Sequence, residues 1–186
     1  MAKLFDGIDD ALRDFVQAQP IFFVATAPLG ATGLINCSPK GNRGEFAVVD
    51  STRVAYLDQT GSGVETVAHL KENGRIVLMF CAMSGPPRIV RFHGTGHVVQ
   101  RISPEFETLA PYFDRSDDVG VRCIISIDVH RVSDSCGYGV PLMEFTQHRP
   151  TMDQWAARKG PEGIAVYQSE KNRRSIDGLS GLESSL

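Results

Sequence analysis

The chain has 186 residues, of which 42% are hydrophobic and 22% are charged, and its formal net charge is −3. This composition excludes a fully disordered or fibrous protein and is typical of one globular domain. The 18 glycine and 10 proline residues imply many turns, which argues against a helix bundle. The acidic balance argues against nucleic acid as a partner. Since there is neither a membrane-spanning apolar stretch nor the apolar middle of a signal peptide, we expect a cytoplasmic protein that does not enter a membrane.

The N-terminal part changes from a helical to an extended pattern near residue 20. Apolar residues at helical spacing predict a helix over 7–19, which ends at Pro20. Runs rich in β-branched and aromatic residues follow, separated by turn residues. They predict four strands, over 21–26, 33–37, 45–49 and 53–58.

The rest of the chain alternates further strands with short helices. Strands are predicted over 75–81, 88–99 and 123–132, with Gly94 and Gly96 marking a bulge or bend. Helices are predicted over 64–72, which Asn73 and Gly74 would cap, and from Ser103 to about 113, which Ser103 would cap. A helical pattern from 152 to about 172 precedes a polar tail over 175–186, which is either mobile or docked on a partner subunit.

Strands joined mostly by tight turns favour antiparallel pairing over a parallel doubly wound sheet. We therefore expect a mainly β fold with flanking helices, of the α+β class, built as an antiparallel barrel. No composition shift separates two domains, so residues 1–186 are expected to form one domain with a helical C-terminal extension from about 150.

Residue patterns for catalysis by the protein's own groups are missing. There is no nucleophile elbow, no Walker A loop and no pair of cysteines at zinc-binding spacing. His93 and His97 would lie roughly 13 Å apart on an extended strand, too far to bind one metal ion. Cys81 and Cys123 stand in apolar runs and are expected in the core. No metal site and no catalytic residue is predicted.

Two polar segments, over 36–44 and 57–66, each follow a predicted strand. The first carries hydroxyl, amide and ammonium donors, and the second places small residues before a helix. Backbone N–H groups at a helix start bind anions, and glycine allows a ligand to approach the backbone. Lys40 and this helix start could therefore hold a phosphate. The alternative is that both segments are ordinary hairpin loops and that Ser62 is only a helix N-cap.

The order of these and other motifs resembles a known family. The motifs are FFVATA at 22–27, INCSPKG at 35–41, AYLD at 55–58, GSGVET at 61–66 and PRIVRFHG at 87–94. Together they resemble the pyridoxamine 5′-phosphate oxidase-like flavoproteins, which have the FMN-binding split-barrel fold. The likeness covers about residues 20–140, and the stretches 136–141 and 171–179 look like one subgroup of that family.

The resemblance implies a split barrel of about six antiparallel strands and a homodimer with FMN at the subunit interface. By position, Asn36, Ser38, Pro39 and Lys40 would contact the flavin ring and ribityl chain. The strand under the cofactor would end in Asp58, Gln59 and Thr60. The phosphate would be held by Ser62 and Thr66. Three further residues would lie near the flavin or close the site: Arg88, Arg91 and Tyr138.

The chain also departs from the family pattern. The stretch 62–65 lacks the cation of the true oxidases, so Lys40 or Arg43 would have to supply the charge. The tail ends in 178–182 without the arginine motif that grips the substrate phosphate, which argues against oxidation of pyridoxamine phosphate. The expected function is an FMN-dependent oxidoreductase acting on a small molecule. Two alternatives stay open: a non-catalytic flavin-binding or sensing protein, and a binder of a deazaflavin- or haem-type ligand.

Overall fold

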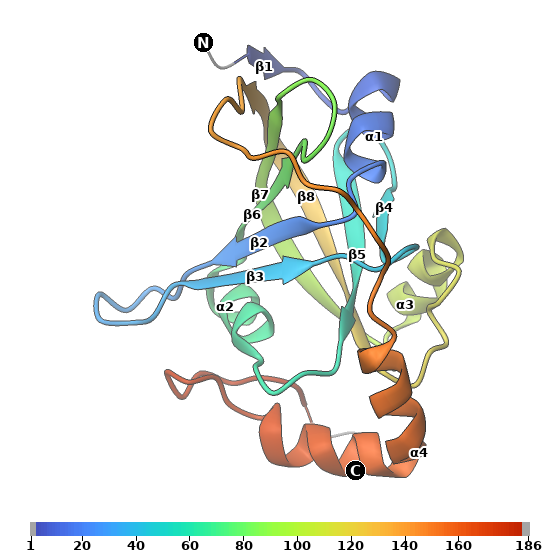
Figure 1. Ribbon diagram of the computed structural model, residues 1–186. Helices are drawn as coiled ribbons and strands as arrows, with labels where there is room; N and C mark the ends of the chain where they lie inside the picture. The colour runs from blue at the N-terminus through green and yellow to red at the C-terminus, as the bar shows by residue number, and fades with distance from the viewer. Residues whose placement is uncertain (1–2, 184–186) are drawn as a thin grey trace.

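The computed structural model describes residues 3–183 and shows a single curled antiparallel sheet with helices around it (Figure 1). Seven of its eight strands hydrogen-bond in the order β3-β2-β6-β7-β8-β5-β4, and the eighth, β1, pairs with β8 beside this path. The elements, in chain order, are β1 (Lys3–Phe5), α1 (Asp10–Gln17), β2 (Phe22–Thr26), β3 (Asn36–Lys40), β4 (Phe46–Val48), β5 (Arg53–Gln59), α2 (Glu65–Asn73), β6 (Arg75–Cys81), β7 (Ile89–Gln100), α3 (Pro104–Leu109), the 3-10 helix η1 (Ala110–Tyr112), β8 (Val121–Ser135) and α4 (Thr151–Lys171).

The concave side of the sheet holds the main core. In β2, alternate residues point inward: Phe22, Val24 and Thr26 are buried and the residues between them are half-buried. A cluster of aromatic rings fills the centre, with Phe22 stacked on Phe80 at 5.4 Å between ring centroids. A smaller apolar cluster lies under α3. The expected mainly antiparallel β fold with flanking helices is confirmed. The sheet has eight strands, where the sequence pattern placed seven and the resemblance implied about six.

Several local predictions are confirmed by backbone geometry. Gly74 ends α2 in the left-handed region, at φ 71°, and its N–H donates to the Leu70 carbonyl. The register of β7 on β8 shifts between His93 and Gly94, which is the predicted bulge. A Cβ atom on Gly94 would lie 2.2 Å from the Asp128 carbonyl oxygen, so the close strand approach requires glycine there.

The second predicted strand was placed too early in the chain. The hairpin partner of β2 is Asn36–Lys40, not 33–37, and it is an edge strand of the sheet. The polar segment predicted as a turn is therefore extended, and its side chains alternate between two faces. Pro39 is tolerated because an edge strand does not need every N–H for pairing.

Near the ends of elements, the structure answers the alternative left open for Ser62, refines one predicted helix and corrects the expectation for the tail. Val64, not Ser62, is the N-cap of α2, and it offers no side-chain hydrogen bond. The helix predicted from 152 to about 172 is confirmed as α4, with a kink at Gly160, where φ is 65°. The tail docks on its own chain as far as it is described, since the N–H of Leu182 donates to the Asn172 carbonyl. Residues 184–186 of that tail lie outside the described part. None of the described helices is both long and apolar enough to cross a membrane.

Candidate functional site

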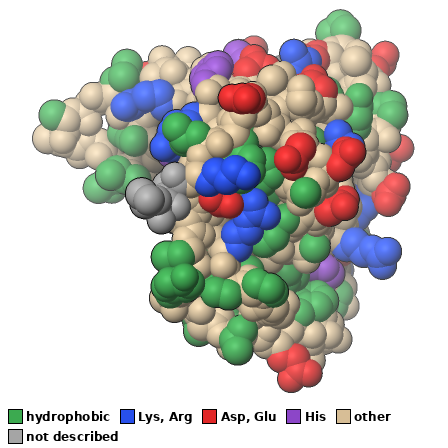
Figure 2. All heavy atoms as spheres, turned by 90° about the horizontal axis from the view of Figure 1, so that it is seen from above, with side chains coloured by type: hydrophobic (Ala, Val, Ile, Leu, Met, Phe, Trp, Pro, Cys, Tyr) green, Lys and Arg blue, Asp and Glu red, His purple; other side chains and the backbone are tan. Residues whose placement is uncertain are grey.

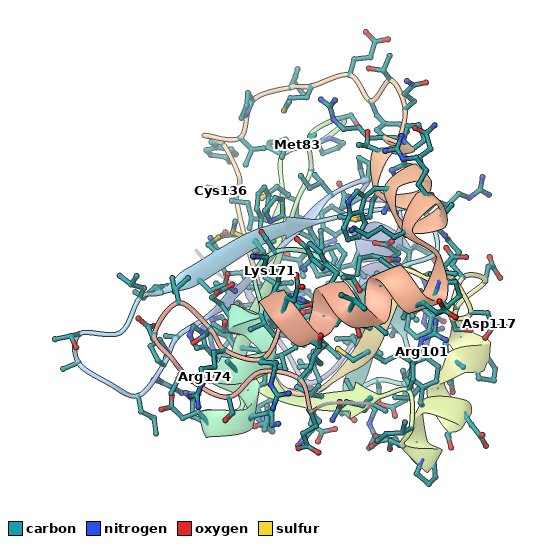
Figure 3. The ribbon with its side chains drawn as sticks, turned by 90° about the horizontal axis from the view of Figure 1, so that it is seen from below. Met83, Arg101, Asp117, Cys136, Lys171 and Arg174 are labelled. Carbon is teal, nitrogen blue, oxygen red and sulfur yellow. The ribbon has the colours of Figure 1, made fainter. Side chains whose placement is uncertain are left out.

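A large open cleft of about 2620 Å³ runs along the edge strand β3. Its walls are β3 and the residues after it, the segment 59–66, the loop 82–88, and the C-terminal segment 142–158. Met83 and Cys136, labelled in Figure 3, come from the two loops that form one rim. Seen from above, the face that carries β1 and these loops shows basic and apolar side chains side by side (Figure 2).

The polar floor of the cleft is made of side chains on β2, β3 and α2 that hydrogen-bond to one another. The Asn36 amide donates to the hydroxyls of Thr26 and Thr66, at 3.2 and 3.0 Å. Ser38 donates its hydroxyl proton to the amide oxygen of Asn36 at 3.0 Å. Three of the predicted residues, from two elements distant in sequence, are thus brought together. Their hydroxyl and amide groups are oriented by one another before any ligand binds.

Beside this floor lies an ion cluster built on the carboxylate of Asp58. The carboxylate is fully buried and accepts from the ammonium of Lys40 at 3.0 Å and from the guanidinium of Arg122 at 2.6 Å. Burial alone would raise the pKa of Asp58, but the charges of Arg122 and Lys40 lower it to about 2. Lys40 lines the cleft while Asp58 does not. Asp58 therefore lies beneath the cleft surface, where its carboxylate holds the side chains of Lys40 and Arg122 in position.

Arg122 is a cleft residue that the sequence reasoning missed. It extends from β8, lines the cleft, and donates from Nη1 to the carbonyl oxygen of Gly63 at 2.8 Å. The segment 62–65 lacks a cation of its own, and Arg122 places one beside it. A signal was present in the sequence, because Asp58 ends one strongly apolar run and Arg122 begins another. Buried charges of opposite sign are expected to pair.

The remaining predicted residues divide between those on the cleft wall and those away from it. Residues on the wall are Pro39, Gln59, Thr60, Ser62 and Arg88. Arg88 is also paired with Asp134 at 3.0 Å. Besides Asp58, two predicted residues do not line the cleft: Arg91 donates to the Ser135 hydroxyl, and Tyr138 is 83% exposed.

The C-terminal helix supplies an aromatic wall that was not predicted. Trp155 and Tyr167 stand on either side of the kink at Gly160 and pack edge-to-face, with ring centroids 5.0 Å apart. Both line the cleft. Within residues 3–183 no three His, Cys, Asp or Glu side chains are grouped so that they could hold a metal ion.

Comparison with known proteins shows which family the chain resembles. The family model described as pyridoxamine 5′-phosphate oxidase matches residues 8–136. The chain is 38% identical to the pyridoxamine 5′-phosphate oxidase family protein ustO of Aspergillus flavus, over all of this chain and 80% of that protein.

Solved structures agree at the level of the fold. HupZ of Group A Streptococcus matches with a TM-score of 0.53 and 25% identity, over 67% of this chain and 91% of that chain. An FMN-binding protein from Syntrophomonas wolfei matches with a TM-score of 0.51 and 12% identity, over 66% of this chain and 82% of that chain. The sheet is thus that of the FMN-binding split-barrel proteins, and the chain belongs to the pyridoxamine 5′-phosphate oxidase family.

Proposed function

We propose that the cleft binds FMN and that the protein is an FMN-dependent oxidoreductase acting on a small molecule. The observation that carries the proposal is the set of phosphate-binding groups at the corner of the cleft where β3, β5 and α2 meet. There, a helix start without a side-chain cap, the exposed Ser62 and the cations Lys40 and Arg122 all border one cleft. Unpaired N–H groups at a helix start together with positive charge are the usual receptors of a phosphate group.

The donors present fit the parts of FMN. The amide of Asn36 and the hydroxyl of Ser38 would meet the flavin ring or the ribityl chain. Ser62 and Thr66 would meet the phosphate, with Arg122 supplying the charge that the loop lacks. Gly61 leaves room at this corner, because a Cβ atom there would meet nothing within 4 Å.

When bound, FMN would supply the hydride chemistry, and the chain would supply orientation and electrostatics. Lys40 has the clearest role among the described residues. Its ammonium is held by a buried carboxylate and also borders the cleft, so it would keep a positive charge beside the flavin. Such a charge stabilises the anionic reduced ring. This role requires no catalytic acid or base from the protein.

A second copy of the chain would complete the site. Apolar residues of the cleft wall stand exposed, with Leu142 at 79% and Phe145 at 53%. A homodimer with FMN at the interface would cover such residues. This arrangement follows from the family resemblance, and the exposure of the cleft wall favours it.

The test is titration of the purified protein with FMN, followed by NADH or NADPH. We expect quenched flavin fluorescence, a raised melting temperature and reduction of the bound flavin. Lys40→Ala should weaken FMN binding by about 1–3 kcal/mol, the range for a hydrogen bond to a charged group. Arg53→Ala is the control, because Arg53 pairs with Asp128 away from the cleft.

Each alternative predicts a different result. Failure to bind FMN would refute the proposal. Bound FMN that neither nicotinamide reduces would favour a non-catalytic flavin-binding protein. A deazaflavin- or haem-type ligand would be recognised by the absorption spectrum of the purified protein.

A further inference from the structure

The loop over 60–63, which borders the proposed phosphate corner, is held from two sides. From the barrel, the Thr60 N–H donates to the Gly120 carbonyl at 2.7 Å, and Arg122 donates to the Gly63 carbonyl. From the opposite side the partners are a residue of α4 and the residue that caps its C-terminal end. Gln168 donates its amide to the Thr60 hydroxyl, and Asn172 donates its amide to the Gly61 carbonyl, both at 2.8 Å.

Asn172 is the centre of this second set of contacts. Its side chain is fully buried, and its backbone carbonyl accepts from the N–H of Leu182 at 2.8 Å. The returning segment packs tightly here, since a Cβ atom on Gly181 would lie 2.2 Å from the Asn172 carbonyl oxygen and 3.0 Å from the Val64 side chain. The tail is therefore locked against both the end of α4 and the start of α2.

The same segment reaches two further elements of the cleft region. The N–H of Ile176 donates to the Glu65 carboxylate at 3.3 Å. Asp177 accepts from the N–H of Leu34, in the connection between β2 and β3, at 2.9 Å. After α4 ends at Lys171, the chain turns back beside α2 (Figures 1 and 3). One short segment thus contacts the 60–63 loop, the first turn of α2 and the β2–β3 connection.

The contact with Glu65 has an electrostatic consequence. Glu65 is the first residue of α2, and its carboxylate lies against Gly63, since Oε2 would be 2.3 Å from a Cβ atom there. A carboxylate at a helix start competes with other anions for the same positive potential. The Ile176 N–H fixes one oxygen of this carboxylate on the tail side.

We infer that residues 168–182 form a latch that shapes the phosphate corner of the cleft, with Gln168 and Asn172 as positioning residues. The inference rests on the proposed function, because it assigns the latch to the phosphate end of FMN. The physical basis is pre-organisation: a loop already held in its binding conformation loses less conformational entropy when the ligand binds. The latch lies beyond the segment 8–136 that matches the family model.

The test compares Gln168→Leu and Asn172→Ala with Glu170→Ala. Glu170 lies between the two on α4, is exposed, and makes no side-chain hydrogen bond or ion pair among the described residues. The first readout is amide hydrogen exchange of the protein without ligand. Amides over 60–66 should exchange faster in the two latch variants than in the control.

The second readout is the affinity for FMN relative to riboflavin, which lacks the phosphate. The latch variants should bind FMN at least tenfold more weakly, about 1.4 kcal/mol, while riboflavin affinity changes less than twofold. Equal losses for both ligands would show a general structural role and overturn the inference. The inference would also be overturned if the latch variants showed the same amide exchange and the same ligand affinities as Glu170→Ala.

Two controls keep the outcomes separate. If Asn172→Ala fails to fold, as circular dichroism would show, the half-buried Gln168→Leu carries the test. If the unaltered protein binds neither FMN nor riboflavin, the proposed function fails, and hydrogen exchange alone then decides whether 168–182 holds the loop.

Discussion

At the scale of single residues, charge inside the barrel organises the candidate site. Asp58 and Arg122 lie on the neighbouring strands β5 and β8 and are both almost completely buried. Removing one member of a buried pair leaves an uncompensated charge, which costs far more than the pair itself contributes. Burial also raises the pKa of the adjacent Tyr56 hydroxyl and Cys123 thiol. Both therefore stay neutral at physiological pH, and the cluster's only ionised members are Asp58 and its two cations.

The low pKa of Asp58 predicts how stability changes in acid. Its pKa is about 2 in the folded protein, against the ordinary value of 3.8 for an aspartate side chain. The ionised form therefore stabilises the fold above about pH 4, and this contribution, about 2 kcal/mol, is lost as the pH falls toward 2. Urea unfolding at a series of pH values measures it.

Asp58→Asn is the matched variant for that measurement. Near neutral pH it should lower the free energy of unfolding by about 3–5 kcal/mol, because Arg122 loses its buried partner. Between pH 4 and 2 its stability should fall less than that of the unaltered protein. Parallel curves in this range would contradict the role of Asp58.

At the scale of elements, backbone geometry at the ends of helices and strands decides how the cleft is framed. The edge strand β3 is polar and contains a proline, yet it pairs with β2 along its whole length. The helix α2 begins without a side-chain cap and ends at a left-handed glycine. The uncapped start faces the cleft, and the glycine end leads directly into β6.

Gly74→Ala tests how much that turn contributes. The backbone there has φ 71°, and a Cβ atom would lie 2.8 Å from the Thr95 side chain. We expect a loss of about 1–2 kcal/mol from the left-handed conformation, with more from the contact, measured by denaturant unfolding. Gly139→Ala is the control, because a Cβ atom there meets nothing within 4 Å. Equal effects of the two substitutions would argue against backbone strain at Gly74.

At the scale of the whole molecule, the sheet curls around a core but leaves one broad cleft along its edge. The segment 142–158 crosses this side, and several of its apolar side chains stay exposed. Exposed apolar side chains grouped on one segment favour an association site there. The proposed dimer would bury it.

The oligomeric state can be measured directly. Light scattering coupled to gel filtration should give twice the chain mass of 20.3 kDa. Because assembly stabilises the folded state by mass action, the melting temperature should rise with protein concentration. A mass of one chain at every concentration, with a constant melting temperature, would rule out the dimer.

The sequence by itself determined the family, the antiparallel β class and most element positions. Alternating apolar residues, the cap at Ser103 and the glycine at 74 act over a few residues, so their effects can be inferred locally. It also predicted the polar residues of β3 and the 60–63 loop, whose roles toward FMN stay predictions. The start of β3 was missed, because the extent of an edge strand is set by its neighbour.

Only the tertiary structure decided how these parts form one site. Arg122 reaches Asp58 across 64 residues of chain, and Asn172 reaches Gly61 across 111. No local pattern specifies such contacts, because they arise only after the sheet has curled and α4 has packed against it. The same packing gave the tail a place on its own chain, at the corner of the cleft that we propose holds the phosphate.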